Sequence, residues 1–495
     1  MGVVGLWDIV DAVKEDVNLS ECSGKRFAVD LSAWIVQCSS SVTAPRVPSP
    51  DFCRRNIFHR SLNLVTYGIS LVFVMDGPVA PLLKKRKRGQ EYYKSALQYK
   101  ELLTAMGFPV IDSVGEAEKM CAELDRMKVV DGVLTEDGDA LIYGAQNVYK
   151  GLFKESNKEY TATKYSMSDI TARLGLTQKD LIAFALLSKG DFCDGVPGIG
   201  KSKFIDLVKE MKKNNVEDVL DRLLLWKDNE RLSALEDLQR SLKGIRKSKH
   251  CTKCHHEGLM SAHGKSGCET CQLNVDCRER NEWKAESGEK YPECPCNYHK
   301  KEAEIMPYQT ELKIRATALS VKQFPEQGVK EEYLNCIQDI RGELNTTMQL
   351  PDFKAVCDRM SGNFPSAAST LSHMLPAYTM LALHGKLADM EIKPLSIIKS
   401  CVKNFRPQFR VNWEKSGIKN LPSGDSSSYE FKVPAPLFEK KYPALVKQYN
   451  SNSKKSSQTG AAETGKRKGK VEEGNKRVTD FFQVVKSQKT RETKD

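Results

Sequence analysis

The sequence has no long apolar run, and this absence argues against one class of structure. No stretch of about 18 consecutive apolar residues occurs, so no membrane span is expected. The opening MGVVGLWDIVDAV is too short and too interrupted by charge for a signal peptide. Gly2 invites myristoylation, but Leu6 stands where that motif requires Ser or Thr. No internal repeat is found.

The lack of a signal peptide decides how the 15 cysteines are interpreted. Reduced thiols and metal ligation are favoured over disulfides. With 40% hydrophobic and 28% charged residues, most of the 495-residue chain is expected to be globular, in two to four domains. The net charge of +12 fits a polyanionic partner such as nucleic acid or an anionic membrane, although solubility alone also explains it.

Residues 1–210 alternate between short apolar runs and helical segments. The runs that predict strands are Arg26–Leu31, Ser70–Met75, Asp131–Thr135 and Asn147–Tyr149. Helices are expected over Gly115–Lys128 and Asp180–Leu187. This alternation predicts an α/β domain with a mostly parallel sheet, whose functional sites lie at the carboxyl ends of the strands.

Composition divides the rest of the chain. We expect a charged helical stretch at residues 211–245, a Cys/His-rich insert at 246–300 and a helical region at 301–390. Residues 391–450 are expected to hold short strands and a final helix, and residues 451–495 to form a disordered basic tail.

Seven acidic residues stand where an expected strand ends or an expected helix begins. They are Asp30, Asp76, Glu116, Glu118, Asp137, Asp139 and Asp191. Carboxylates beside apolar runs are costly to bury without a cation, and seven together would repel one another. Mg²⁺ prefers oxygen ligands, and two such ions can flank a phosphodiester during hydrolysis. Any one of these acids could instead be a helix cap or turn residue, but their joint occurrence favours a metal centre.

Two further motifs suit contact with a nucleic-acid backbone. In GVPGIGKSKF a glycine-rich turn opens a helix, where backbone N–H groups can hold a phosphate. Its candidate residues are Gly195, Gly198, Gly200, Lys201 and Lys203. The basic run Lys84–Arg88 precedes tyrosines and suits a single strand or a scissile phosphate, although a solvated helix face or a localisation signal remains an alternative.

The cysteine-rich insert carries a spacing typical of structural zinc. Cys251-x2-Cys254 and Cys268-x2-Cys271 are separated by thirteen residues and predict a four-thiolate site. A second site is conceivable from Cys277, Cys294, Cys296 and His299, with four further histidines as spare ligands. The alternative is a loop with reduced thiols.

Six sequence blocks resemble, in order, the nuclease blocks of the XPG/flap-endonuclease superfamily. They are MGVVGLWDIV, AVDLSAW, LVFVMDG, GEAEKMCAEL, LTEDGDALIYG and GVPGIGKSKF. The resemblance implies a PIN-like α/β nuclease core with a mostly parallel sheet and a helix-two-turn-helix element, in an N-terminal region, 1–100, and an internal region, 101–215. The seven acids fall on the family's metal-binding positions.

Within the superfamily the chain resembles the Gen-type Holliday-junction 5′-flap endonucleases. The opening block, the short gap between Asp76 and Glu116 and the cysteine-rich insert carry this resemblance. Residues 391–450 resemble the chromodomain that follows the nuclease in this branch. The sequence departs from the family around Asp191, where Lys189-Gly190 precede the acid and Phe192 follows it.

The resemblance implies a nuclear endonuclease that cuts 5′ flaps, forks and Holliday junctions with two Mg²⁺ ions, which Mn²⁺ can replace. It places Lys84 and Arg88 in a catalytic arch, adds Gly2 to the DNA-binding residues and suggests K⁺ at the helix-two-turn-helix. It also implies a homodimer on four-way junctions. A 5′ exonuclease, an ordinary flap nuclease and a non-catalytic junction-binding scaffold remain alternatives. NKRVTDFF in the tail suggests a sliding-clamp peptide with Val478, Phe481 and Phe482.

Overall fold

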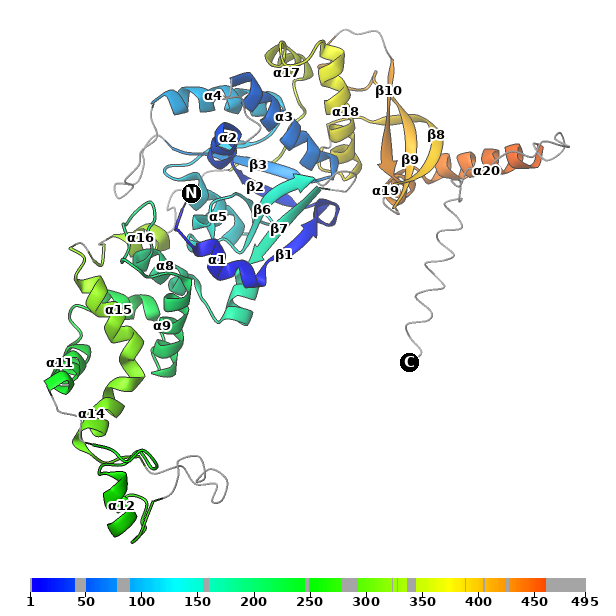
Figure 1. Cartoon of the computed structure of the whole chain (residues 1–495). Helices are drawn as coiled ribbons and strands as arrows, with labels where there is room; N and C mark the ends of the chain where they lie inside the picture. The colour runs from blue at the N-terminus through cyan, green and yellow to red at the C-terminus, as the bar shows by residue number, and fades with distance from the viewer. Residues whose placement is uncertain are drawn as a thin grey trace. The chain divides into compact units, whose positions relative to one another are not determined.

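The computed structural model describes residues 2–40, 50–77, 90–154, 160–244, 249–277, 293–322, 324–326, 328–335, 344–387, 389–403, 406–422 and 427–459 (Figure 1). The chain folds into two compact units. The first comprises residues 13–174 and 334–495 with Met1, and the second comprises 2–12 and 175–333. No helix in the described part of the chain is long and apolar enough to cross a membrane.

A seven-stranded sheet, ordered β1-β7-β6-β5-β2-β3-β4, forms the centre of the first unit. Its strands are β1 (Glu15–Asn18), β2 (Arg26–Asp30), β3 (Ser70–Met75), β4 (Val110–Asp112), β5 (Val133–Leu134), β6 (Asn147–Lys154) and β7 (Tyr160–Ser166). Strands β4, β3, β2, β5 and β6 pair in parallel, whereas β7 pairs antiparallel with both β6 and the edge strand β1. The predicted α/β class with a mostly parallel sheet is confirmed.

The parallel strands are added on both sides of β2. The chain first passes to β3 and β4, then returns to β5 and β6 on the other side of β2. Because such crossovers are right-handed, the helices after β2 and β3 lie on one face and the helix after β4 on the other. Figure 1 shows α2 and α3 above the sheet and α5 below it. The reversal between β2 and β5 is the point where α/β sheets open a site.

Ten α-helices in the described part of the first unit surround the sheets. They are α2 (Leu31–Ser40), α3 (Pro50–Thr66), α4 (Gln90–Ala105), α5 (Ala117–Arg126), α6 (Asp139–Ile142), α7 (Met167–Asp169), α17 (Phe353–Arg359), α18 (Ala367–Leu383), α19 (Ala435–Lys441) and α20 (Pro443–Thr459). In α5 the buried residues Met120, Cys121 and Leu124 recur at helical spacing and face the sheet.

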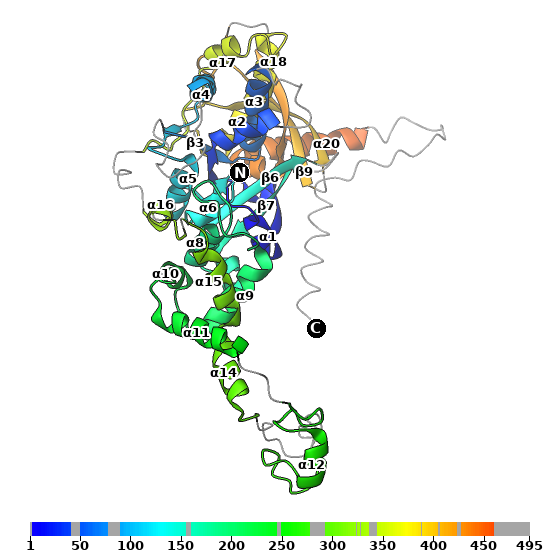
Figure 2. The ribbon, with the colours of Figure 1, turned by 60° about the vertical axis from the view of Figure 1, so that its left-hand side comes forward.

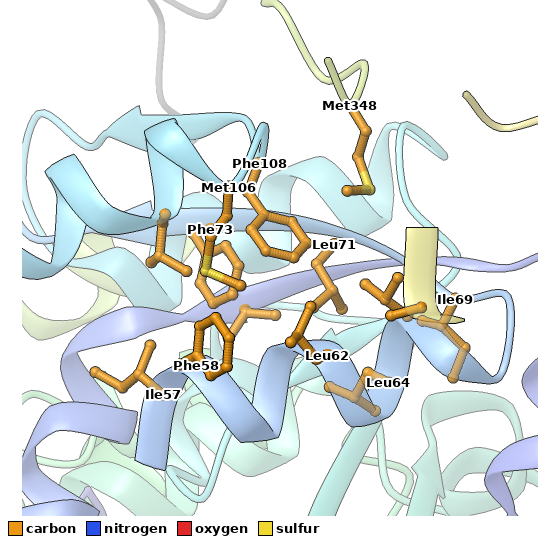
Figure 3. Packing of buried hydrophobic residues seen from close by; sticks show 14 of the residues in the cluster. Ile57, Phe58, Leu62, Leu64, Ile69, Leu71, Phe73, Met106, Phe108 and Met348 are labelled. Carbon is orange, nitrogen blue, oxygen red and sulfur yellow. The ribbon is translucent and has the colours of Figure 1, made fainter. Parts of the chain in front are cut away.

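The main apolar core lies between α3, β3 and the segment after α4 (Figure 3). Every residue of β3 is buried, as expected for an interior parallel strand. Phe73 makes an edge-to-face contact with Phe108 at 5.3 Å between ring centroids. The buried hydroxyl of Tyr378 in α18 donates to the carbonyl of Met106, which ties a late helix to this early core.

Residues 393–441 of the first unit form a small three-stranded antiparallel sheet with a helix against it. The strands β8 (Lys393–Lys403), β9 (Arg406–Glu414) and β10 (Ser428–Pro434) are followed by α19. Trp413 is fully buried and contacts Phe431 and Phe438. It therefore belongs to this module's core. A sheet-and-helix module was expected here, and its chromodomain-like character stays a prediction.

The second unit is helical. It contains α1 (Leu6–Val10), α8 (Gln178–Leu187), α9 (Lys201–Lys213), α10 (Val219–Leu224), α11 (Glu230–Gly244), α12 (Met260–Ser266), α14 (Asn297–Ile305), α15 (Gln309–Leu319) and most of α16 (Val329–Leu334), as Figure 2 also shows. Helix α8 begins with a complete capping box, in which Thr177 and Asp180 exchange side-chain and backbone hydrogen bonds.

A buried ion pair holds α10 and α15 of this unit together. Glu311 is fully buried and accepts hydrogen bonds from Arg222 Nε at 2.7 Å and from Trp226 Nε1 at 2.9 Å. Removing one member of such a pair leaves the other polar groups buried without their partner.

We predict that Glu311→Ala lowers the free energy of unfolding of this unit by about 3 kcal/mol, because it orphans Arg222 and the Trp226 indole N–H. Glu311→Gln, which keeps an acceptor, is expected to cost less. Urea denaturation followed by tryptophan fluorescence measures both. Asp237→Ala, which breaks the exposed surface pair with Arg240, is the control and should change stability by less than about 0.5 kcal/mol. Equal stability of Glu311→Ala and wild type would contradict the assigned role.

Candidate metal centre

The carboxyl ends of three neighbouring parallel strands each carry an acid. Asp30 is the last residue of β2, Asp76 directly follows β3, and Asp137 lies three residues after β5. Because β2 pairs in parallel with both β3 and β5, these ends meet at one edge of the sheet. Acids more than 100 residues apart in sequence are therefore neighbours in space.

Two further acids come from the start of α5. Glu116 occupies the N-cap position, but its side chain makes no capping hydrogen bond, and Glu118 lies in the first turn. Asp76 Oδ1 accepts the backbone N–H of Ala117 at 2.9 Å, which joins the end of β3 to the start of the helix. One carboxylate oxygen each of Asp76, Glu116 and Glu118 lie within 4.8 Å of one another.

A glycine permits this close approach. The backbone N–H of Gly77 donates to the Gly115 carbonyl at 2.8 Å. A Cβ at position 77 would lie 2.2 Å from the carbonyl oxygen of Ser113 and 2.4 Å from that of Val114. Both are backbone atoms and have little room to move. Any larger residue would push the β3 end, and Asp76 with it, away from α5.

Thr135 organises the acids around β2 and β5. Its hydroxyl donates to Asp30 Oδ2 at 3.2 Å and accepts the backbone N–H of Asp137 at 3.0 Å. Asp30 Oδ1 also accepts the N–H of Ala33 at 2.9 Å, and Asp137 Oδ1 accepts the N–H of Asp139 at 3.1 Å. These bonds orient the carboxylates before any ligand binds. Sequence reasoning missed Thr135, whose only signal is its place between a buried strand and an Asp-x-Asp motif.

All six acids of this edge are buried. Their relative exposure lies between 0% for Asp30 and 6% for Asp76 and Glu116, a range in which carboxylates are rare unless paired or bound to metal. Burial, and then the charge of Asp139, raises the pKa of Asp137 well above its ordinary value, and Asp30 adds to the shift. Burial and the charges of Asp30 and Glu118 likewise raise the pKa of the Cys121 thiol.

Asp125 shows how a structural carboxylate differs from this group. It is also buried, and burial raises its pKa to about 6. However, its Oδ2 accepts the backbone N–H groups of Gln146 at 2.5 Å and Asn147 at 2.9 Å, so it anchors the start of β6. By contrast, Asp76, Glu116 and Glu118 bring carboxylate oxygens within 4.8 Å of one another, and the charges of Asp139 and Asp30 act on Asp137. Repulsion within these groups favours bound cations.

The donor set fits hard divalent ions. It offers carboxylate oxygens, the ligands that Mg²⁺ prefers, from several independent segments around one edge. Asp76, Glu116 and Glu118 would hold one ion. Asp137 and Asp139 follow β5, and Asp30 ends β2, which lies between β5 and β3 in the sheet. A metal there would supply a Lewis acid and an activated water.

Asp191, the seventh predicted acid, lies in the second unit, in the loop between α8 and α9. Its assignment to the same metal centre stays a prediction. The unusual neighbours have local explanations. Phe192 is buried and packs edge-to-face on Tyr333, with ring centroids 5.3 Å apart. A Cβ at Gly190 would lie 3.1 Å from Val3 Cγ2, so the residue leaves room for the N-terminal segment.

The predicted glycine-rich turn is present before α9, and phosphate binding there stays a prediction. Gly195 and Gly198 have φ of +70° and +74°, and a Cβ at Gly195 would lie 2.4 Å from the Ser188 carbonyl carbon. Gly200 is the N-cap of α9, and Lys201 and Lys203 are exposed in its first turn. This leaves backbone N–H groups and two cations at one helix start.

The N-terminal segment that contains Gly2 lies beside this element within the second unit. The N–H of Val4 donates to the Lys189 carbonyl at 2.8 Å, and Ser188 Oγ donates to the Val4 carbonyl at 2.7 Å. Lys201 Nζ donates to the carbonyl of Asp8. Other candidates fall outside the described residues, namely Lys84, Arg88, Val478, Phe481 and Phe482.

The structure divides the predicted zinc quartet. Cys251 and Cys254 group with His263 and Cys277, whereas Cys268 and Cys271 group with Cys254 and His256. A further group contains His250, Cys294, Cys296 and His299. The sequence predicted that the two Cys-x2-Cys motifs share one site. The spacing of the histidines between them does not reveal which thiols each histidine contacts.

We predict that Glu118→Gln stabilises the metal-free protein by on the order of 1 kcal/mol, because it removes one of several buried like charges. Mg²⁺ should then raise the melting temperature of wild type more than that of the variant, since it binds the native state. Thermal unfolding with EDTA and with Mg²⁺ measures both effects. The control is Asp112→Asn, an exposed acid paired with Lys100. If Glu118→Gln is less stable than wild type without metal, and Mg²⁺ stabilises both proteins equally, the proposed repulsion among the carboxylates is wrong.

Comparisons with known proteins identify two family regions in this chain. Family models match the XPG N-terminal domain over residues 1–96 and the XPG I-region over residues 107–191. The "Flap endonuclease GEN homolog 1" of Mus musculus is 30% identical over 479 residues, which cover 91% of this chain and 50% of the mouse protein. The chain thus spans about half the length of that relative.

Solved structures share the fold. The structure of human GEN1 in complex with Holliday junction DNA matches with a TM-score of 0.60 at 24% identity, covering 93% of this chain and 100% of that chain. A GEN1 structure described as a Holliday junction-resolving enzyme with product DNA and Mg²⁺ matches with a TM-score of 0.51 at 18% identity, covering 92% and 100%. Both XPG regions are thus present in this chain, and over 91% of its length it is similar to a GEN-type flap endonuclease.

Proposed function

We propose that this chain is a metal-dependent, structure-selective DNA endonuclease that cuts 5′ flaps, replication forks and Holliday junctions. The observation that carries the proposal is the group of six buried carboxylates at the carboxyl edge of β2, β3 and β5. Divalent cations bound at this edge would neutralise the repulsion among the carboxylates and could hold a phosphodiester against them.

Two Mg²⁺ ions are the proposed cofactors, with Mn²⁺ as a substitute. One would activate a water as the nucleophile, and the other would stabilise the leaving 3′ oxygen, which gives a 5′ phosphate and a 3′ hydroxyl. Asp76, Glu116 and Glu118 form a ready group of oxygen donors for one ion. Asp137 and Asp139, oriented through Thr135, would serve the second.

The second unit would grip the duplex. The exposed helix start of α9, with Gly200, Lys201 and Lys203, offers backbone N–H groups and cations to a phosphate, and K⁺ is proposed there. Gly2 lies in the segment hydrogen-bonded to the same element. Asp191, Lys84 and Arg88 complete the proposed catalytic residues. Nuclear location, a homodimer on four-way junctions and clamp binding through Val478, Phe481 and Phe482 belong to the same proposal.

We predict that Glu118→Ala and Asp137→Ala each lower the cleavage rate on the order of 1,000-fold or more while junction binding persists. The expected size follows from the several kcal/mol of transition-state stabilisation that a metal ion supplies. Single-turnover cleavage of a labelled 5′ flap with Mg²⁺, together with a gel-shift assay in Ca²⁺, measures the two quantities. Asp112→Asn is the matched control and should cleave as wild type does. Normal cleavage by either active-site variant would show that the site is misassigned.

The substrate preference is tested separately. With Mg²⁺ we predict cleavage of both a 5′ flap and an intact four-way junction, with paired symmetric cuts in the junction because two copies act on it. Mapping the cut sites on flap, nicked and four-way substrates measures this. Cutting of flaps alone would indicate an ordinary flap nuclease, stepwise removal of nucleotides an exonuclease, and binding without any cut a scaffold.

A further inference from the structure

The described part of the cysteine-rich insert, residues 249–277 and 293–300, has almost no apolar core. Its buried cluster consists of five cysteines, with Leu273 partly buried against them. Larger apolar residues face solvent instead, with exposures of 48% for Leu259, 57% for Met260 and 66% for Val275. A segment of this size cannot fold on apolar burial alone and needs disulfides or metal ions.

Disulfides do not hold the insert. No cysteine in the described part of the insert forms a disulfide. Cys251 Sγ and Cys277 Sγ are 3.6 Å apart, whereas a disulfide bond measures about 2.05 Å. A separation of 3.6 Å instead matches the edge of a tetrahedron around zinc. Zn–S bonds of about 2.3 Å and Zn–N bonds of about 2.0 Å place neighbouring ligand atoms roughly 3.5–3.8 Å apart.

Two histidines point a ring nitrogen into these thiols. His263 Nδ1 lies 3.3 Å from Cys254 Sγ, and its Nε2 lies 2.9 Å from the Glu257 carbonyl oxygen. Since a carbonyl only accepts, Nε2 carries the proton, and Nδ1 turns a lone pair toward the sulfur. A second ring nitrogen bound to a carbonyl is the usual support of a metal-binding histidine.

His256 faces a second pair of thiols. Its Nδ1 lies 3.4 Å from Cys268 Sγ and 3.3 Å from Cys271 Sγ, and the residue is 1% exposed. Soft donor atoms packed this closely in a buried place repel one another as thiolates. A cation with affinity for sulfur and nitrogen removes that repulsion.

Cys254 belongs to both groups. With Cys251, His263 and Cys277 it forms one set of four donors, and with His256, Cys268 and Cys271 it forms a second. Cys254 is fully buried between them. A single thiolate has enough lone pairs to bridge two ions, so seven side chains can complete two tetrahedral sites.

The backbone supports the same arrangement in both Cys-x2-Cys motifs. The residue after the second cysteine of each motif, His255 and Gln272, has a positive φ, of 58° and 57° respectively. This left-handed conformation is unfavourable for residues other than glycine and persists where the surroundings impose it. Two equal turns therefore present paired thiols in the same way.

A third group closes the insert. Cys296 Sγ lies 3.5 Å from His250 Nε2 and 3.4 Å from His299 Nδ1, and Cys294 completes the four donors. Cys296 is the N-cap of α14, and its sulfur accepts the N–H of His299. An ion here would join the entrance of the insert to its exit, which are 46 residues apart in sequence.

We propose that the insert is a three-zinc module. Cys254 bridges two of the ions, and His250, Cys294, Cys296 and His299 hold the third. Each site is closed by four protein donors, so the ions are structural and have no open position for catalysis. The module would be a folded arm of the second unit rather than a loop. This proposal is independent of the nuclease function, because it rests on other residues and on metal content.

The test measures zinc in the full-length protein by mass spectrometry after dialysis against millimolar Mg²⁺, which displaces zinc from the acidic centre. Three zinc ions per chain are expected for wild type. Cys254→Ser should retain one, because it removes the bridge from both neighbouring sites, and Cys296→Ser should retain two. The control Cys401→Ser changes a half-buried thiol on β8, outside all three groups, and should retain three.

The bridge has its own readout. Substitution of ¹¹³Cd for zinc in the wild-type protein should give three resonances, two of which are coupled to each other through the shared sulfur. This experiment needs no variant, so it decides the question even where Cys254→Ser fails to fold. Fewer than three ions in wild type, two or more ions in Cys254→Ser, uncoupled cadmium resonances, or stoichiometric iron in place of zinc would each overturn the proposal.

Discussion

Mutual repulsion among buried carboxylates is the constraint on which the candidate centre depends. Six acids with exposures of at most 6% share one sheet edge, and the raised pKa of Asp137 reflects both its burial and the charges of Asp139 and Asp30. Such a group destabilises the metal-free fold, so the surrounding scaffold has to be rigid. The fully buried β3 and the aromatic packing of Phe73 provide that rigidity directly behind Asp76.

Four groups of buried polar side chains in the described part of the chain have different surroundings, and each indicates a different role. Asp125 accepts two backbone N–H groups and anchors a strand. Glu311 accepts from Arg222 and Trp226 and joins two helices. Asp76, Glu116 and Glu118 bring carboxylate oxygens within 4.8 Å of one another and fit hard divalent ions. The thiols and imidazoles of the insert face one another and fit zinc. The donor chemistry therefore separates structural charges from candidate metal sites.

The departure from the family pattern around Asp191 has a packing explanation. Gly190 leaves room for Val3, and Phe192 fills the space against Tyr333. Both changes serve the packing of the N-terminal segment and of α16 within the second unit. They alter the surroundings of the acid without replacing it, which keeps Asp191 available as a proposed ligand.

The sequence by itself determined the α/β class, the presence of strands β2, β3, β5 and β6, and six acids that lie at or after the ends of β2, β3 and β5 and at the start of α5. Periodic apolar runs and short acidic motifs are local signals that survive without a structure. It did not reveal the antiparallel strands β1 and β7, the orienting role of Thr135 or the position of α18 on the early core, where Tyr378 donates to Met106. Nor did it reveal that Cys254 belongs to two donor groups. These features depend on contacts between segments far apart in the chain, and only the tertiary structure decides which of many chemically similar partners a side chain meets.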